Sequence, residues 1–220
     1  HCKRVATARS DLAQAAARAA TARSAREAAA DEYRSLAEFD LARCEIYGRD
    51  YDSVLRRLEV LRPVAERSGY RHLAARAWWV SGYVHAVRYE VAPALGQLRR
   101  ALDGLVATGD VEGSAIVGLL LAETSHWYGL GDDASSFSRR ALAALSRLGP
   151  SGQASIGFAG VAILAGADGE ASASRCLLDC AESVAACAGD RSSEAAATGL
   201  RAVMHSRGGE PWLRPWDALA

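Results

Sequence analysis

The segment AWWVSGYVHAVRYEVAPALGQLRRAL, residues 77–102, decides the fold. Its two apolar halves predict two helices, and RYEVAP between them (residues 88–93) is typical of a short turn followed by a helix start. Gly82, Ala94 and Ala101 lie where small side chains would let two antiparallel helices approach closely. The segment therefore predicts a tightly packed unit of helix, turn and helix.

The same pattern recurs every 40 residues along the chain. Glycine follows a helical segment at four equally spaced places, where it can adopt the left-handed conformation without steric cost. These glycines are Gly69, Gly109, Gly149 and Gly189. The corresponding units are residues 35–74, 75–114, 115–154 and 155–194. Repeats of this length predict an array of stacked helix pairs.

Three positions of every unit carry a small or apolar residue. They are Ala42, Gly82, Ala122 and Ala162 at position 8; Val54, Ala94, Ala134 and Ser174 at position 20; and Leu61, Ala101, Ala141 and Ala181 at position 27. We expect these positions to form the contacts between the helices of one unit and between neighbouring units.

The unit 75–114 resembles the tetratricopeptide repeat. Its matching residues are Trp78, Gly82, Ala94, Leu98 and Ala101, at positions 4, 8, 20, 24 and 27. A standard repeat of this family has about 34 residues, and HEAT repeats, with about 40 to 47, are the competing fold. Stretched repeats of this kind look like those of large bacterial multidomain proteins, associated with CHAT peptidase domains or transcription regulators. The resemblance implies an all-α fold, a right-handed α–α superhelix of about five helix pairs.

The repeats predict three regions. Residues 1–34 are rich in Ala and Arg and predict a long N-terminal helix that caps or continues the array. Residues 35–194 hold the four repeats, and residues 195–220 a capping helix and a tail with Trp212 and Trp216. We expect this tail to fold back on the last helix or to insert into a neighbouring domain. Because the chain starts at a histidine, we expect it to be part of a longer protein.

Composition narrows the classes of partner. The 26 basic and 26 acidic residues balance, which argues against a nucleic-acid surface or a polybasic membrane patch. No apolar run approaches the roughly 20 residues of a membrane helix. The five cysteines do not form the pattern of a secreted disulfide framework, so we expect reduced thiols and a cytoplasmic location. The expected partner is a protein or peptide, possibly another domain of the same chain, and neither nucleic acid nor membrane.

The family resemblance implies that the first helix of each unit lines a concave face. The residues placed there are Phe39, Arg43, Tyr47, Arg76, Trp79, Tyr83, Leu119, Glu123, His126 and Trp127. An aromatic groove of this kind suits a peptide segment, with Trp and Tyr as anchors. The alternative is that these aromatic side chains fill space between repeats or pack on another domain. Since Trp79 and Tyr83 replace the Lys and Asn clamp of some family members, binding of a terminal carboxylate is not expected.

Two groups of residues have metal-ligand chemistry. Cys176, Cys180 and Cys187 share one face of a helix, but their spacing matches no zinc pattern, and cysteine is also a common small core residue. Glu123 and His126 are one helical turn apart, yet a metal site would need ligands from other helices. We therefore expect no metal and no cofactor.

A pair of arginines also recurs after 40 residues, as Arg99 with Arg100 and Arg139 with Arg140. Such a ladder could follow a phosphate backbone, but in a neutral chain a solvated outer face is the simpler interpretation.

The sequence contains no catalytic constellation, because GPSG and GADG lack the strand and the lysine of a phosphate loop. We expect no enzyme activity. The predicted function is a protein–protein interaction scaffold that binds a peptide segment or a linked effector domain through its concave aromatic face. The alternative is a ligand-sensing or partner-sensing arm of a larger bacterial regulator or CHAT-type peptidase.

Overall fold

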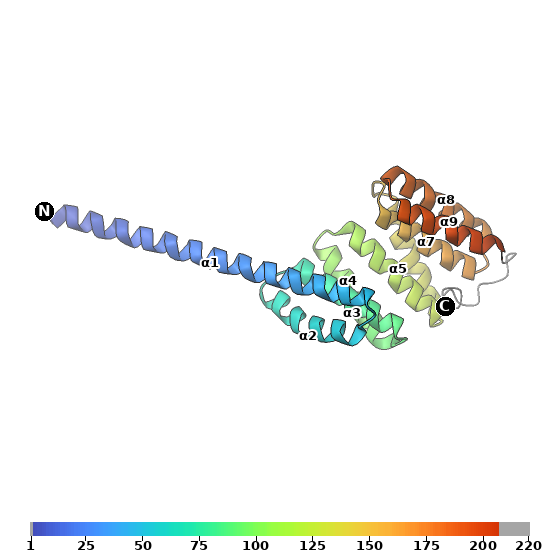
Figure 1. The fold of residues 1–220 in the computed structure, drawn as a ribbon, viewed down its shortest axis with the longest axis horizontal. Helices are drawn as coiled ribbons and strands as arrows, with labels where there is room; N and C mark the ends of the chain where they lie inside the picture. Colours follow the sequence, from blue (N-terminus) through green and yellow to red (C-terminus); the bar gives the residue numbers. More distant parts are fainter. Residues whose placement is uncertain (1, 207–220) are drawn as a thin grey trace. The chain divides into compact units, whose positions relative to one another are not determined.

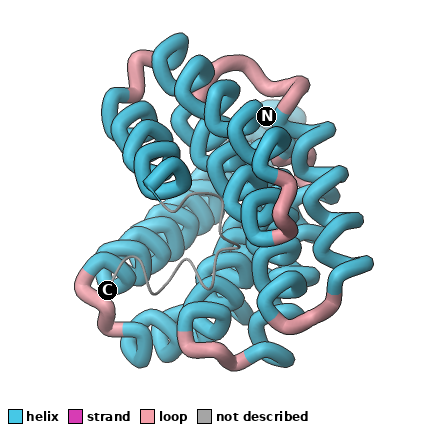
Figure 2. Tube along the Cα trace, turned by 90° about the vertical axis from the view of Figure 1, so that its right-hand side faces the viewer, coloured by secondary structure: helices cyan, strands magenta, loops and turns pink. Residues whose placement is uncertain are grey.

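The protein is all-α. The computed structural model describes residues 2–206, and every regular element in that range is a helix (Figure 1). The helices are α1 (Cys2–Tyr47), α2 (Tyr51–Arg67), α3 (Arg71–Val87), α4 (Val91–Ala107), α5 (Val111–Trp127), α6 (Gly131–Leu145), α7 (Gly152–Ala167), α8 (Ala171–Ala188) and α9 (Arg191–Ser206). Short loops join them, as Figure 2 shows. The tail with Trp212 and Trp216 lies outside the described residues.

The chain divides into two compact units, His1–Leu73 and Ala74–Ala220. The first contains α1 and α2, and the second contains most of α3 and the helices that follow it. In the first unit α1 is one continuous helix of 46 residues, so the predicted N-terminal helix runs without a break into the first helix of the first repeat.

Helix and turn lengths explain the repeat. Helices α2 to α5 each have 17 residues. Turns of three residues separate them, so the starts of successive helices are 20 positions apart, at Tyr51, Arg71, Val91 and Val111. The 40-residue period of the sequence is therefore two helix-and-turn steps.

A left-handed residue in each short turn reverses the chain. The residues with positive φ are Arg49, Gly69, Tyr89, Gly109, Gly129, Gly169 and Gly189. At Gly109, the glycine N–H donates to the Val106 carbonyl at 3.1 Å and the next N–H, of Asp110, donates to the Leu105 carbonyl at 3.0 Å. These are the two bonds of a Schellman motif, which satisfies the last carbonyls of the helix.

The same turn starts the next helix. The Asp110 carboxylate accepts a hydrogen bond of 2.8 Å from the N–H of Gly113, which caps the N-terminus of α5. Three residues thus end one helix and begin another, and the compact reversal leaves the two helices side by side.

Gly149 is an exception to the predicted glycine pattern. The left-handed conformation is confirmed at Gly69, Gly109 and Gly189 but is wrong at Gly149. Pro150 follows it, and a residue before proline is pushed toward extended conformations. The connection between α6 and α7 is accordingly longer, and the Ser151 hydroxyl caps α7 by accepting from the Ala154 N–H at 3.0 Å.

The repeated small positions form the core, as predicted. All twelve residues at positions 8, 20 and 27 are buried. At Gly82 a Cβ atom would lie 2.8 Å from Leu98 Cγ and 3.0 Å from the Leu98 backbone nitrogen, so α3 and α4 touch there. The one hydroxyl in the set is also accommodated, because Ser174 Oγ donates to the Ala162 carbonyl at 2.6 Å.

In the second unit the helices pack in chain order. Each of α4 to α8 packs on the next helix, and α5 also packs on α7, and α7 on α9. Within the described range, α6 and α8 have no comparable contact with each other. The first helices of successive pairs therefore form a continuous layer while the second helices spread apart. This arrangement is solenoid-like, and it puts the first helices on the inside of the curve.

The contact at Gly82 predicts opposite effects for two helix glycines. Gly82→Ala should reduce the free energy of unfolding by about 1–3 kcal/mol, because the new methyl group meets the Leu98 backbone. At Gly96 on α4 a Cβ atom would have open space around it, so Gly96→Ala should raise the free energy of unfolding by about 0.5–1 kcal/mol through helix propensity. Urea unfolding followed by circular dichroism measures both. Equal effects of the two variants would contradict the close packing.

The left-handed turn residues predict a second pair of opposite effects. Tyr89 has φ of 60° and its side chain is 68% exposed, so Tyr89→Gly should stabilise the unit by about 1 kcal/mol. Gly109→Val should destabilise it by at least about 1–2 kcal/mol, because a β-branched residue is poorly tolerated at φ of 73°. Melting temperatures of the two variants give the comparison. A Tyr89→Gly variant that melts below the parent chain would count against the turn geometry.

Candidate functional site

The residues predicted for the concave face divide between the two units, and the three in the first unit differ in their surroundings. Phe39 is only 3% exposed and belongs to the core, although the sequence pattern placed it on the binding face. Arg43 is exposed and pairs with Asp40 at 3.5 Å, one turn away. Tyr47, at the end of α1, is 84% exposed. Phe39 therefore offers no surface to a partner.

The other seven residues lie on α3 and α5 of the second unit. Leu119 is buried, in a core cluster that includes Ile116 and Leu145. The remaining six are half-buried: Arg76, Trp79, Tyr83, Glu123, His126 and Trp127. Half-burial of aromatic and charged side chains on the inner helix layer is what a binding surface requires, because each side chain is held by the fold and still reachable.

Trp79 connects this face to the core. Its ring packs against the cluster around Leu98 and Val117 and also against the cluster around Ile116 and Leu119. The side chain therefore fills space between repeats, as the alternative interpretation expects, while part of it remains accessible. Its position also shows that α3 and α5 are neighbours.

Glu123 is the unusual charged residue of this face. Burial raises the pKa of its carboxyl above the ordinary value, an effect that the Trp127 indole partly offsets. The residue as a whole is half-buried, while many protein atoms surround its carboxyl. Glu123 forms no ion pair with any residue that the structure describes. A carboxylate in such surroundings carries a desolvation cost that nothing in the described chain offsets fully.

The indole of Trp127 is also incompletely satisfied. Its Nε1 is buried beside the Glu123 carboxyl, one turn earlier on α5, and this contact lowers the pKa of Glu123 although it falls outside regular hydrogen-bond geometry. The His126 ring meets the Trp127 ring edge-on, with centroids 4.9 Å apart and an angle of 86°. His126 Nδ1 in turn lies 3.5 Å from the Asp168 carboxylate at the end of α7. These contacts fix the orientation of the indole.

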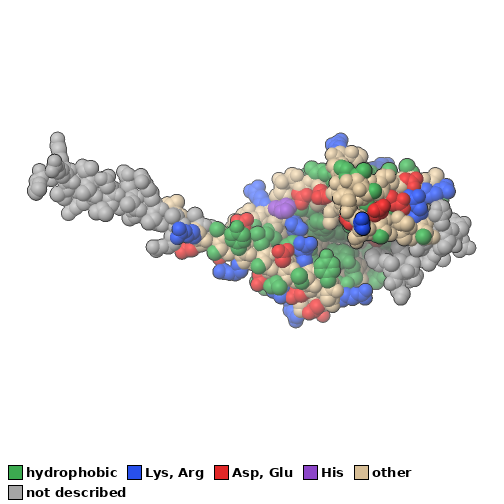
Figure 3. Space-filling view, turned by 45° about the horizontal axis from the view of Figure 1, so that its top comes forward, with side chains coloured by type: hydrophobic (Ala, Val, Ile, Leu, Met, Phe, Trp, Pro, Cys, Tyr) green, Lys and Arg blue, Asp and Glu red, His purple; other side chains and the backbone are tan. Residues whose placement is uncertain are grey.

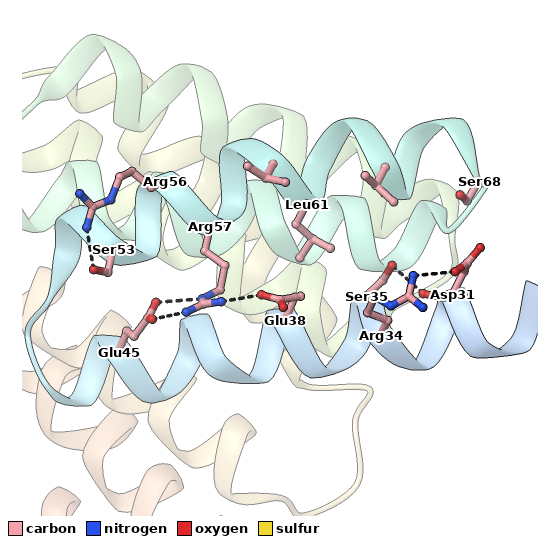
Figure 4. Close-up of a pocket in the computed structure, with 12 residues that line it drawn as sticks. Asp31, Arg34, Ser35, Glu38, Glu45, Ser53, Arg56, Arg57, Leu61 and Ser68 are labelled. Atoms are coloured by element: carbon pink, nitrogen blue, oxygen red, sulfur yellow. Dashed lines mark hydrogen bonds and ion pairs between the residues drawn. The ribbon is translucent and has the colours of Figure 1, made fainter.

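A concavity in the first unit was not predicted from the sequence. It is a groove of about 720 Å³ in the first unit, between α1 and α2 (Figure 4). Its lining residues are Asp31, Arg34, Ser35, Glu38, Glu45, Ser53, Arg56, Arg57, Val60, Leu61, Val64 and Ser68. The signal in the sequence was the spacing of Glu38 and Glu45, two turns apart on α1, opposite Arg57 on α2.

The charges of this groove satisfy one another. Arg57 bridges Glu38 at 2.5 Å and Glu45 at 2.5 Å, and this contact lowers the pKa of Glu45. Arg34 pairs with Asp31 at 2.9 Å. The three acidic and three basic side chains of the lining cancel. The ion pairs of Arg57 therefore join α1 to α2, and the lining of the groove has no net charge that would attract a charged ligand.

The arginine ladder lies on an exposed surface, as the simpler interpretation expected. Arg99 pairs with Asp133 of α6 at 2.8 Å, and the Arg100 guanidinium stacks over the Trp78 ring, 4.8 Å from its centroid. Acidic and basic side chains are interspersed on the face shown in Figure 3. The observed pairings use these arginines to connect helices.

The cysteines of α8 are not core residues. Cys176, Cys180 and Cys187 are all exposed, in contrast to the expectation that cysteine packs as a small hydrophobe. Partial burial of the Cys180 thiol and the neighbouring Cys176 raise the pKa of Cys180. A smaller fraction of this thiol is therefore in the nucleophilic thiolate form. In the part of the chain that the structure describes, no group of three or more His, Cys, Asp or Glu side chains can hold a metal ion.

Comparison of the chain with known protein families, with curated proteins and with solved structures finds no match. Among residues 2–206, no helix has both the length and the apolar character needed to cross a bilayer.

The surroundings of Glu123 predict that it lowers stability. Its pKa is raised on folding, so the folded state binds a proton more readily than the unfolded chain, and stability falls as pH rises from 4.5 toward the folded-state pKa. Glu123→Gln should therefore raise the free energy of unfolding at pH 7 by about 1 kcal/mol, or roughly 2–4 °C in melting temperature.

The control is Asp103→Asn, an exposed acid on α4, which should change stability by less than about 0.5 kcal/mol. Thermal unfolding at pH 7 and pH 4 measures the effect. The increase in melting temperature that Glu123→Gln causes should be smaller at pH 4 than at pH 7. A Glu123→Gln variant that is less stable at pH 7 would show that the carboxylate has a stabilising partner.

Proposed function

We propose that the chain is a protein-interaction scaffold that binds a peptide segment on the inner face of its second unit. The observation that carries the proposal is the set of half-buried aromatic side chains, Trp79, Tyr83 and Trp127, on two neighbouring first helices. Large aromatic side chains held by a packed core are the usual anchors of protein interfaces, because little conformational entropy is lost when they bind. A linked domain of the same chain would use the same surface.

The repeat architecture supports this proposal. Helix pairs with Trp78, Gly82 and Ala101 at the positions of a tetratricopeptide repeat stack in chain order, and arrays of this kind create extended concave surfaces. We propose that the chain is a tetratricopeptide-like array with a lengthened repeat.

The paired arginines support a protein partner over a nucleic acid. A phosphate-binding surface needs free cations in register, whereas Arg99 is bonded to Asp133 and Arg100 stacks on Trp78.

The proposal predicts a peptide ligand that depends on the inner face. Short random peptides displayed on phage would be selected against the folded chain, and the enriched peptides measured by isothermal titration calorimetry. The double variant Trp79→Ala/Tyr83→Ala should weaken binding at least about 10-fold to 100-fold, which corresponds to the loss of interface anchors. Circular dichroism must first show that the variant is folded.

The matched control is Trp78→Ala, which removes the same side chain from the adjacent position of α3, where the ring lies under Arg100. This variant should retain affinity within about threefold, a difference below about 1 kcal/mol. Selection of no peptide, or equal loss of affinity in the folded variant and the control, would contradict a peptide site on this face.

A further inference from the structure

A long part of helix α1 has no helix of the first unit packed on it. Helix α2 has 17 residues and α1 has 46. At about 1.5 Å per residue their lengths are about 26 Å and 69 Å, so α2 spans well under half of α1. The contacts of Arg57 with Glu38 and Glu45 place α2 beside the C-terminal part of α1 (Figures 1 and 4). Within residues 2–73, the part of α1 before Asp31 is therefore uncovered.

A missing turn explains why α1 is so long. Helices start 20 residues apart from Tyr51 to Val111, and the same spacing predicts an earlier turn at residues 28–30. Those three residues are all alanine, the strongest helix former, and α1 continues through them. Residues 11–27 therefore do not fold back on residues 31–47, as consecutive helices of the second unit do.

The C-terminal part of α1 has an exposed side with large apolar residues. Tyr33 is 75% exposed, Leu36 is 41% exposed, and Tyr47 is exposed as well. Asp40 belongs to the same side, because residues three, four or seven positions apart lie above one another on a helix. The buried residues on the opposite side are Ser35, Phe39 and Ala42. Tyrosine and leucine thus line the side of α1 that faces away from its buried side.

The charges of α1 also divide along its length, basic before residue 27 and acidic from there on. The charged residues of the first part are Lys3, Arg4, Arg9, Arg18, Arg23 and Arg26, with Asp11 as the acid. Those of the second part are Glu27, Asp31, Glu32, Glu38, Asp40 and Glu45, with Arg34 and Arg43 as the bases. Arg57 holds two of these acids, and the other four are exposed.

This division makes α1 complementary to itself in one orientation. Two parallel copies would place basic beside basic and acidic beside acidic, whereas two antiparallel copies place opposite charges together. An interface between identical chains related by a two-fold axis needs such self-complementarity, because each copy contributes the same surface.

We infer that two copies of the chain associate through antiparallel α1 helices, with the two-fold axis near Ala29. Residues 11–27 of one copy then pack on the exposed side of residues 31–47 of the other. They take the place of the helix that a turn at residues 28–30 would have supplied from the same chain. Exchange of an element between identical chains is a low-cost route to a dimer. The inference does not depend on the proposed peptide-binding function.

The position of the axis determines which residues meet. Residues at equal distances from Ala29 along the sequence lie opposite each other in the pair. Arg18 and Asp40 are each 11 positions from it, and Arg26 and Glu32 are each three positions from it. Each copy therefore contributes both members of two pairs of opposite charge. A nucleic acid fits α1 less well, because the acidic part of the same helix would repel it.

Sedimentation equilibrium of the whole chain at low salt, over about 1–100 μM, tests the inference. The expected result is a monomer–dimer equilibrium that shifts toward monomer at higher salt. The variant Glu32→Arg/Asp40→Arg should raise the dissociation constant at least about 10-fold, because it places arginine opposite Arg26 and Arg18. The variant Arg18→Glu/Arg26→Glu should weaken the dimer similarly.

Combining all four substitutions tests the orientation. The combined variant exchanges the charges across the axis, so an antiparallel dimer should regain a dissociation constant within about threefold of the parent chain. A parallel dimer would gain nothing, because each substituted residue would face its own copy. The matched control is Glu59→Arg/Asp103→Arg, which makes the same change of net charge at exposed acids of α2 and α4 and should leave the dimer within about threefold.

Circular dichroism shows whether each variant keeps its helix content. A parent chain that is monomeric over the whole concentration range overturns the inference and leaves this side of α1 to solvent or to another kind of molecule. A dimer that the control weakens as much as Glu32→Arg/Asp40→Arg does, or that the four combined substitutions fail to restore, also overturns it. Peptide binding through Trp79 and Tyr83 is measured on another helix, so either proposal can fail while the other stands.

Discussion

The three-residue turn is the constraint on which the rest of the structure depends. One left-handed residue and one capping residue end a helix and start the next, as Gly109 and Asp110 do between α4 and α5. Because the turns between α2 and α5 all have three residues and these helices all have 17, the small residues at fixed offsets come into contact. Where Pro150 prevents this turn, the connection is longer and a serine provides the cap.

The turn also determines which surface is available for binding. Because each turn reverses the direction of the chain, every second helix lies in the same layer. In this layer α5 packs on α7, and α7 packs on α9. Side chains that point inward from this layer are crowded by neighbouring helices and still reach solvent. Trp79 illustrates the result, because it contacts two core clusters and remains partly accessible. Trp79 therefore contributes to the packing of the core, and any variant of it needs a test of folding.

The charged residues of the two units differ in how they are paired. In the first unit Arg57 satisfies Glu38 and Glu45, so the groove between α1 and α2 is electrostatically complete. In the second unit Glu123 lacks such a partner, and burial raises its pKa. Folding energy alone would favour a neutral residue at that position.

The sequence by itself determined the helix pairs, their 40-residue period and the buried small positions, because these depend on neighbours within two turns or on a regular spacing. It also led to the prediction of a binding face on the first helices of the units, on α1, α3 and α5, which stays a prediction. Only the tertiary structure decided that Phe39 and Leu119 are core, that Cys176 is exposed and that Glu123 lacks an ion pair. Burial and ion pairing depend on side chains from other helices, and the spacing along one helix does not specify which of these come near.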